Sequence, residues 1–208
     1  MKRPPARPAP VRLIACGALA RELLLLMEQC PPDSFELSCL PASWHNHPER
    51  ILPGVKRKVE AARRDGKAVM VVYGDCGTGG ALDAYLDAEA IDRIPGPHCY
   101  EMFLGKADFA AEMDTALGTF FLTDYMVRHF ERLIMNGMGL RRHPQLRDLY
   151  FANYTRLLYI AQTDDAALRK KARAAADDLG LAYEYRFTGY GDLAEFLGQG
   201  HRVAGMSA

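Results

Sequence analysis

The sequence has no excess charge of either sign and no long apolar run. Lysine plus arginine and aspartate plus glutamate number 26 each among the 208 residues, so the net charge is zero. A balanced charge gives no reason to expect a nucleic-acid groove or a membrane-binding face. The longest apolar run near the start, residues 23–27, is far too short to cross a bilayer. We therefore predict that the protein binds neither nucleic acid nor membrane.

An export signal is also missing. Residues 1–10 are basic and rich in proline, and the apolar segment that a signal peptide needs does not follow them. We predict a disordered tail over residues 1–10 and a cytoplasmic protein. The five cysteines are then not expected to form disulfides, so each is either a small buried side chain or a reactive ligand.

Short apolar runs alternate with helical patterns along the chain. The run at residues 68–73 is apolar on both faces, which is typical of a central strand in a parallel sheet. The alternation predicts a Rossmann-like α/β fold, in which a mainly parallel sheet has helices on both faces. The strands that we expect lie at residues 11–15, 35–40, 68–73, 91–94, 156–161 and 181–187.

The second half of the chain is expected to carry a helical insertion. Between the fourth and fifth expected strands we find only helical patterns, and one of them, over residues 123–138, begins with Thr123 as its N-cap. A later helix ends at Gly180, because glycine is a common helix stop. We predict one α/β domain over residues 11–200, or two Rossmann-like halves over 11–98 and 99–200.

Three of the five cysteines follow expected strands. Cys16, Cys76 and Cys99 hold this kind of position, whereas Cys30 ends a helix and Cys39 lies within a strand. In open parallel sheets, ligands bind beyond the carboxyl ends of the strands. We therefore expect Cys16, Cys76 and Cys99 to gather at one edge of the sheet and to form the working site.

Histidines follow strands at the same expected edge. His45 and His47 come after the second strand, and His98 directly precedes Cys99. Thiolate and imidazole ligands suit zinc, and three cysteines also suit an iron–sulfur cluster. The helices expected after Cys16 and Cys76 would stabilise thiolates and lower the pKa of both thiols. The alternative is that these cysteines are small residues in tight turns.

Two loops supply further candidates. The glycine-rich loop after the central strand brings backbone amides close to a bound cofactor, or it is a plain strand-to-helix turn. In the next loop His98 is a candidate ligand or proton carrier, and Glu101 is a candidate to orient it. Without a metal, Cys76 would be the nucleophile of a thiol enzyme beside His98. The cofactor-binding candidates are Gly74, Asp75, Gly77, Thr78, Gly79 and Gly80.

Several motifs of this sequence occur together in one known family. The most specific are G-D-C-G-T-G-G at residues 74–80 and G-P-H-C-Y-E at residues 96–101. Over residues 11–193 the chain resembles the bacterial and archaeal family called domain of unknown function 1638. The resemblance implies that Cys16, Cys76 and Cys99 are the family's cysteines. It also leaves His45 as the histidine that matches the family pattern.

The resemblance also implies a metabolic setting, because members of the family tend to be encoded beside corrinoid-dependent methyltransferases and folate-dependent one-carbon enzymes. We expect a metal-binding protein of methyl-transfer or one-carbon metabolism. Cys16, Cys76, Cys99 and His45 would bind zinc or, as the alternative, an iron–sulfur cluster. A second expectation is a non-catalytic partner subunit of a corrinoid- or folate-dependent methyltransferase system, and a third is a metal-free thiol enzyme. The resemblance assigns no reaction, substrate or oligomeric state.

Overall fold

The computed structural model describes residues 9–115 and 117–206. The first eight residues of the tail expected over 1–10 lie outside this described part. The chain forms two compact units, each with its own parallel sheet. The first unit holds the residues up to Met102 together with those from Asp192 onward, and the second unit is Phe103–Gly191. The α/β fold class predicted from the sequence is confirmed.

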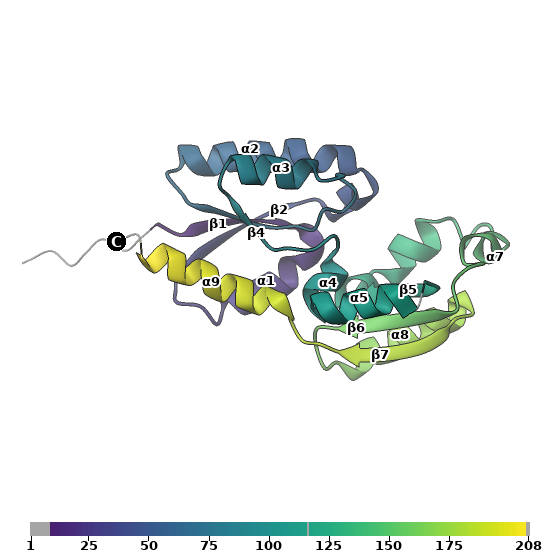
Figure 1. Ribbon diagram of the computed structural model, residues 1–208. Helices are drawn as coiled ribbons and strands as arrows, with labels where there is room; N and C mark the ends of the chain where they lie inside the picture. The colour runs from purple at the N-terminus through teal and green to yellow at the C-terminus, as the bar shows by residue number, and fades with distance from the viewer. Residues whose placement is uncertain (1–8, 116, 207–208) are drawn as a thin grey trace, which may run out of the picture. The chain divides into compact units, whose positions relative to one another are not determined.

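The first unit is a four-stranded sheet in the order β2-β1-β3-β4, and its neighbouring strands are parallel. Figure 1 shows α2 and α3 on one face of this sheet and α1 and α9 on the other. The strands are β1 (Val11–Cys16), β2 (Phe35–Leu40), β3 (Val69–Val72) and β4 (Asp92–Arg93). The helices are α1 (Ala20–Met27), α2 (Ile51–Arg64), α3 (Ala81–Ala88) and α9 (Asp192–Met206), and α4 (Cys99–Leu104) begins in this unit.

The apolar pattern explains why these segments pack as they do. Leu13, Ile14 and Ala15 are fully buried, so β1 is covered on both faces and lies inside the sheet. In α2 the buried residues recur at helical spacing and form the stripe that faces the sheet. That stripe consists of Ile51, Val55, Val59 and Ala62.

The order of the strands creates a switch point in the first unit. From β1 the chain moves out to the edge strand β2, then returns to the other side of β1 to form β3 and β4. Loops that leave β1 and β3 therefore diverge at their carboxyl ends, which is where ligands bind in open parallel sheets. Cys16 is the last residue of β1, and Tyr73 directly follows β3.

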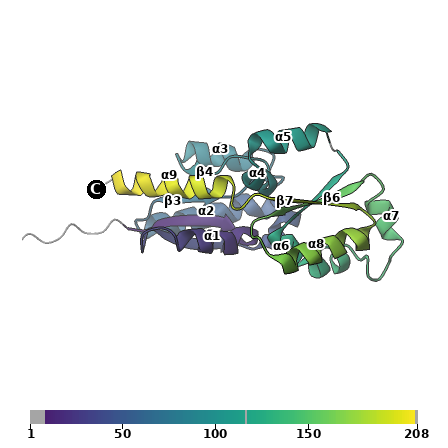
Figure 2. The same cartoon turned by 90° about the horizontal axis from the view of Figure 1, so that it is seen from below.

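The second unit is a three-stranded parallel sheet in the order β5-β6-β7. Figure 2 shows α5 on one face of this sheet and α6 and α8 on the other. Glu112 of α5 is buried and pairs with Arg156 and Arg186 of the sheet. The strands are β5 (Thr119–Thr123), β6 (Arg156–Ala161) and β7 (Ala182–Phe187). The helices are α5 (Lys106–Thr115), α6 (Asp124–Arg128), a π-helical turn (Glu131–Asn136), α7 (Leu146–Tyr150) and α8 (Ala166–Leu179).

Strand β5 was not expected from the sequence, and it corrects the prediction of helices alone in this region. Thr119–Thr123 pairs with β6 along its whole length. The helix expected over residues 123–138 is instead the short α6 followed by the π-helical turn. Thr123 does precede α6, but its side chain makes no capping hydrogen bond. No helix formed by the described residues is both long and apolar enough to span a membrane.

Candidate functional site

The fold of the first unit places three cysteines beyond the carboxyl ends of its strands. Cys16 ends β1, Cys76 lies in the loop after β3, and Cys99 is the first residue of α4 after β4. Cys16 and Cys76 are each 9% exposed, and Cys99 is partly buried. The negative charges of ionised Cys16 and Cys76 each raise the pKa of Cys99, so the three thiols lie within electrostatic range of one another.

Two main-chain contacts join the loops that carry Cys76 and Cys99. The Cys76 amide donates to the Pro97 carbonyl over 3.0 Å, and the Asp75 amide donates to the Gly96 carbonyl over 3.4 Å. Gly74 permits this approach, because a Cβ at that position would lie 2.9 Å from the Pro97 carbonyl oxygen. Glycine at position 74 therefore allows the loops that carry Cys76 and Cys99 to pack against each other.

Arg93 links the same two loops from β4. Its Nη1 donates to the carbonyl of Tyr73 over 2.9 Å and to that of Gly96 over 3.1 Å. Its Nε donates to Asp83 of α3 over 2.6 Å, and the side chain is only 12% exposed. A buried guanidinium with these partners fixes the position of both loops. Arg93 was not among the residues singled out from the sequence.

Asp75 organises the glycine-rich loop. Its carboxylate accepts hydrogen bonds from the Thr78 hydroxyl, the Gly79 amide at 3.2 Å and the Gly80 amide at 2.9 Å. Burial raises the pKa of Asp75, but these hydrogen bonds outweigh burial and the pKa is lowered. The sequence predicts that amides of this loop bind a cofactor. In the structure the Gly79 and Gly80 amides instead bond to the Asp75 carboxylate of the same loop.

Cys76 itself has an unusual backbone conformation. Its φ angle is +47°, in the left-handed region that non-glycine residues seldom adopt, and Gly77 follows at +86°. A left-handed residue with a Cβ costs about 1–2 kcal/mol. Such strain persists where the surrounding contacts enforce it, and it is concentrated at functional sites. Here the enforcing contacts are the Asp75 hydrogen bonds and the bond from Cys76 to Pro97.

The thiol pKa values differ from the sequence-based prediction, which expected helix N-termini to lower them. Burial is the largest cause of a raised pKa at all three cysteines. Burial, ionised Cys16 and Asp75 together raise the pKa of Cys76 to about 12. The prediction was wrong because a 3₁₀ turn follows Cys16 and because α3 begins only at Ala81, so neither thiol lies against a long helix. Without a bound cation all three are neutral thiols at neutral pH.

Two histidines lie together near these loops. The ring centroids of His45 and His98 are 6.3 Å apart. Partial burial of the ring and the neighbouring His98 lower the pKa of His45, although the residue as a whole is exposed. The His98 Nδ1 is buried and makes no hydrogen bond within the described chain. His47 also lies at the surface, with its Nδ1 3.5 Å from a carboxylate oxygen of Glu49.

Glu101 is placed against the turn that precedes Cys99. Gly96 has a φ angle of +114°, and a Cβ built there would lie 3.2 Å from a carboxylate oxygen of Glu101. The Glu101 amide donates to the His98 carbonyl over 3.1 Å. The structure therefore shows Glu101 supporting the loop that carries His98 and Cys99.

Sequence reasoning missed two buried polar residues beside the thiols. Tyr73 is fully buried, and burial together with the three thiols around it raises the pKa of Tyr73. Its hydroxyl has no well-aligned hydrogen bond among the described residues, and its polar neighbour is the Cys16 thiol. Glu22 of α1 is 3% exposed, and its charge raises the pKa of Cys99. In the sequence, the only sign of such a residue is that Glu22 directly precedes the apolar run at residues 23–27.

The donor chemistry of this site suits a soft metal, but the side chains are not arranged as a finished cage. Three thiols and nearby imidazoles are ligands that zinc and iron–sulfur clusters accept. As the side chains stand, no group of three or more histidine, cysteine, aspartate or glutamate residues in the described part of the chain could hold a metal ion. Metal binding would require the thiols to rotate toward one another and to lose their protons.

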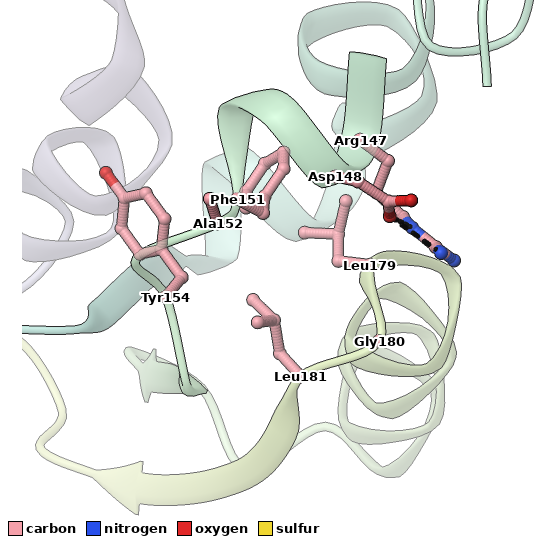
Figure 3. A pocket seen from close by; sticks show the side chains of 8 residues that line it. All are labelled: Arg147, Asp148, Phe151, Ala152, Tyr154, Leu179, Gly180 and Leu181. Carbon is pink, nitrogen blue, oxygen red and sulfur yellow. Dashed lines mark hydrogen bonds and ion pairs between the residues drawn. The ribbon is translucent and has the colours of Figure 1, made fainter. Parts of the chain in front are cut away.

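A separate pocket lies in the second unit. Figure 3 shows Phe151, Leu179 and Leu181 lining it, with Arg147 and Asp148 bonded to each other at its rim. Its volume is about 290 Å³. None of the site residues predicted from the sequence lines this pocket.

Comparison with known proteins identifies a family and nothing closer. No curated protein and no solved structure matches the chain. A family model described as protein of unknown function (DUF1638) matches residues 39–197. The matched segment contains His45, Cys76 and Cys99 and begins after Cys16. Because the match spans more than half of the sequence, this chain belongs to the DUF1638 family.

Proposed function

We propose that the first unit binds a metal through Cys16, Cys76 and Cys99, with His45 as a further ligand. Zinc is the metal that we favour, and an iron–sulfur cluster is the alternative. The observation that carries the proposal is that three thiols from three separate segments lie beyond the carboxyl ends of one sheet and within electrostatic range of one another. Small buried cysteines in unrelated turns have no reason to share such a position.

The electrostatics of the site support a cation there. Ionised Cys16 raises the pKa of Cys76, and both raise the pKa of Cys99, because like charges at close range repel. A divalent cation reverses the sign of this interaction and stabilises all the thiolates at once. The lowered pKa of His45 keeps its imidazole neutral at neutral pH, and the neutral form is the one that binds metals.

The same pKa values speak against a metal-free thiol enzyme. Such an enzyme needs a thiolate at neutral pH, which cysteine nucleophiles obtain from a cationic partner or a helix N-terminus. The raised pKa of Cys76 leaves almost no thiolate there. We therefore do not favour the reading in which Cys76 acts as a nucleophile without a metal.

We infer a role in methyl-transfer or one-carbon metabolism from the family resemblance alone. A zinc held by the three cysteines, with His45 giving up the fourth position to an incoming molecule, would activate a thiol or another methyl acceptor. In that setting Arg93 and Asp75 hold the ligand loops, and His98 offers a buried Nδ1 that exchanges a proton. Components of corrinoid- or folate-dependent methyltransferases are the partners that this role implies.

Metal analysis of anaerobically purified protein tests the metal site. We expect close to one zinc per chain, or iron with the visible absorption of a cluster. The Cys76→Ser variant should lose the metal, while Cys30→Ser should keep it, because Cys30 lies beyond the end of α1 and its thiol donates to the Leu26 carbonyl at 3.5 Å. Absence of both metals from the wild type, or equal loss in the two variants, would overturn the proposal.

A second assay tests the metabolic role separately. The metal-loaded protein is mixed with methylcobalamin and a small thiol, and the methyl thioether is measured. Formation that depends on Cys76 supports methyl transfer. No formation, with metal content intact, removes the methyl-transfer role and leaves the metal site standing.

A further inference from the structure

The first unit has a cavity between the edge strand β2 and helix α2. Its volume is about 430 Å³, which is within the range of small-molecule sites. None of the four proposed metal ligands lines it. The lining residues are Arg12, Ser38, Cys39, Leu40, Pro41, Trp44, Gly54, Arg57, Lys58 and Ala61.

The wall of this cavity has three cationic side chains and no acidic one. Lys58 donates to the Ser38 hydroxyl over 2.7 Å, and a neutral hydroxyl leaves the charge of Lys58 uncompensated. Arg57 is exposed, and no ion pair joins it to another residue in the described ranges. The cavity therefore attracts anions.

Arg12 supplies a buried donor without a partner. Its Nη2 pairs with Glu36 at 2.9 Å and with Asp65 at 3.3 Å, and neither acid lines the cavity. Its Nε is buried and makes no hydrogen bond to any described residue. A buried polar group without a partner calls for an explanation, and an acceptor atom of a bound molecule would provide one.

Trp44 gives the cavity an aromatic wall. A Cβ at Gly54 would lie 2.3 Å from the indole ring, so Trp44 packs directly on the backbone of α2 and its position is fixed. A fixed indole beside cationic side chains suits a flat ring that carries a negative charge, because the ring packs on the indole while the charged group bonds to arginine and lysine.

We propose that this cavity binds a small aromatic anion, with its phosphate or carboxylate group held by Arg57, Lys58 and the Nε of Arg12 and its ring packed on Trp44. The proposal is independent of the metal site. A phosphate and a carboxylate share the chemistry that these side chains recognise. Two probes, adenosine monophosphate and benzoate, distinguish them.

Trp44 makes the test direct, because it is the only tryptophan of the chain and it lines this cavity. The full-length protein is titrated with adenosine monophosphate, benzoate, adenosine and inorganic phosphate, and binding is confirmed by calorimetry. We expect a saturable change with at least one of the two aromatic anions. Adenosine cannot bond to the arginine and lysine side chains, and phosphate cannot pack on Trp44, so each should bind at least about tenfold more weakly.

Lys58→Met and Lys56→Met form a matched pair of variants. Both remove one positive charge from α2, but Lys56 lies over the ring of Tyr85, 4.8 Å from its centroid, and does not line the cavity. We expect Lys58→Met and Arg57→Gln each to raise the Kd about tenfold, and Lys56→Met to leave it within about twofold. Equal weakening by Lys56→Met would mean attraction to general positive charge and would overturn the proposal, as would the failure of both aromatic anions to bind.

Discussion

The main-chain amide of Cys76 donates a 3.0 Å hydrogen bond to the carbonyl of Pro97. This bond ties the loop after β3 to the loop after β4, one residue before His98 and two before Cys99. Arg93 holds the same two loops through the Tyr73 and Gly96 carbonyls. The spacing of Cys76 and Cys99 is therefore set by backbone contacts, which a change in the thiol side chains alone would leave in place.

Removing the Arg93 guanidinium should loosen both loops. Arg93→Met leaves two carbonyls and the Asp83 carboxylate without their donor. We expect the free energy of unfolding to fall by about 2 kcal/mol, because hydrogen bonds from a charged and largely buried donor are lost. Urea denaturation measures this loss. Metal affinity should fall as well, which a competition titration with a chelator measures.

Arg50→Met is the matched control for Arg93→Met. Arg50 is exposed, and its Nε lies 3.6 Å from the Glu49 carboxylate. An exposed ion pair of this kind contributes little, so we expect a change within about 0.5 kcal/mol. Similar losses in the two variants would show that Arg93 acts only as a surface charge.

Gly74 should not tolerate even an alanine. The new Cβ would lie 2.9 Å from the Pro97 carbonyl oxygen and 3.1 Å from the His98 Cα, and both are backbone atoms that move only with their loop. We expect Gly74→Ala to lower the free energy of unfolding by about 1–3 kcal/mol. In Gly198→Ala the added Cβ of helix α9 has nothing within 4 Å, so the same substitution should be neutral or stabilising. Equal stability of the two variants would contradict the packing argument.

Much of this fold can be predicted from apolar runs alone. β2 and β6 occupy the predicted residues, and α8 ends at Gly180 as expected. β5 could not be separated from a helix, because Phe120, Phe121 and Leu122 also fit the start of the helical pattern that follows them. This segment is a strand because it pairs with β6, which is distant in the sequence.

The candidate site can likewise be predicted from the sequence only in part. The strand-end position of Cys16, Cys76 and Cys99 follows from the sequence, because a parallel sheet brings strand ends to one edge. The pKa values do not follow, since burial and the repulsion between thiols depend on distances in the folded chain. The role of Arg93 also depends on those distances. In the sequence it is one arginine near a short strand, and only the fold reveals its two carbonyl partners.

The stability of the second unit should depend on the buried carboxylate of Asp124. Asp124 is fully buried and accepts hydrogen bonds from the Tyr159 hydroxyl at 2.7 Å, the Gln162 amide at 3.0 Å and the Thr163 hydroxyl at 2.5 Å. Asp124→Ala strips these donors of their acceptor and also unpairs Arg128. We expect a loss of about 3 kcal/mol in the free energy of unfolding.

The control for this variant is Asp114→Ala, at an exposed aspartate of α5. A surface substitution of this kind should change the free energy of unfolding by no more than about 0.5 kcal/mol. Circular dichroism during urea denaturation follows both variants. If Asp124→Ala unfolds together with the wild type, the Asp124 network is dispensable and the two strand ends of β5 and β6 are held by the apolar core alone.

The thiols of the metal-free protein should react slowly. Cys76, with its pKa raised from the ordinary 9.0 to about 12, has a thiolate population at neutral pH about a thousandfold below that of an unperturbed thiol. Because only the thiolate is alkylated, and because a more basic thiolate is somewhat more nucleophilic, we expect iodoacetamide to label Cys76 roughly fiftyfold more slowly than glutathione. The rate should then rise about tenfold with each pH unit until the pH approaches the pKa of Cys76. Peptide mapping by mass spectrometry resolves Cys76 from Cys30, which has no second thiol beside it. Rapid labelling of Cys76 alone at neutral pH in metal-free protein would contradict this prediction. It would require a local base or cation that keeps Cys76 ionised. The metal-free thiol enzyme would then be the better hypothesis.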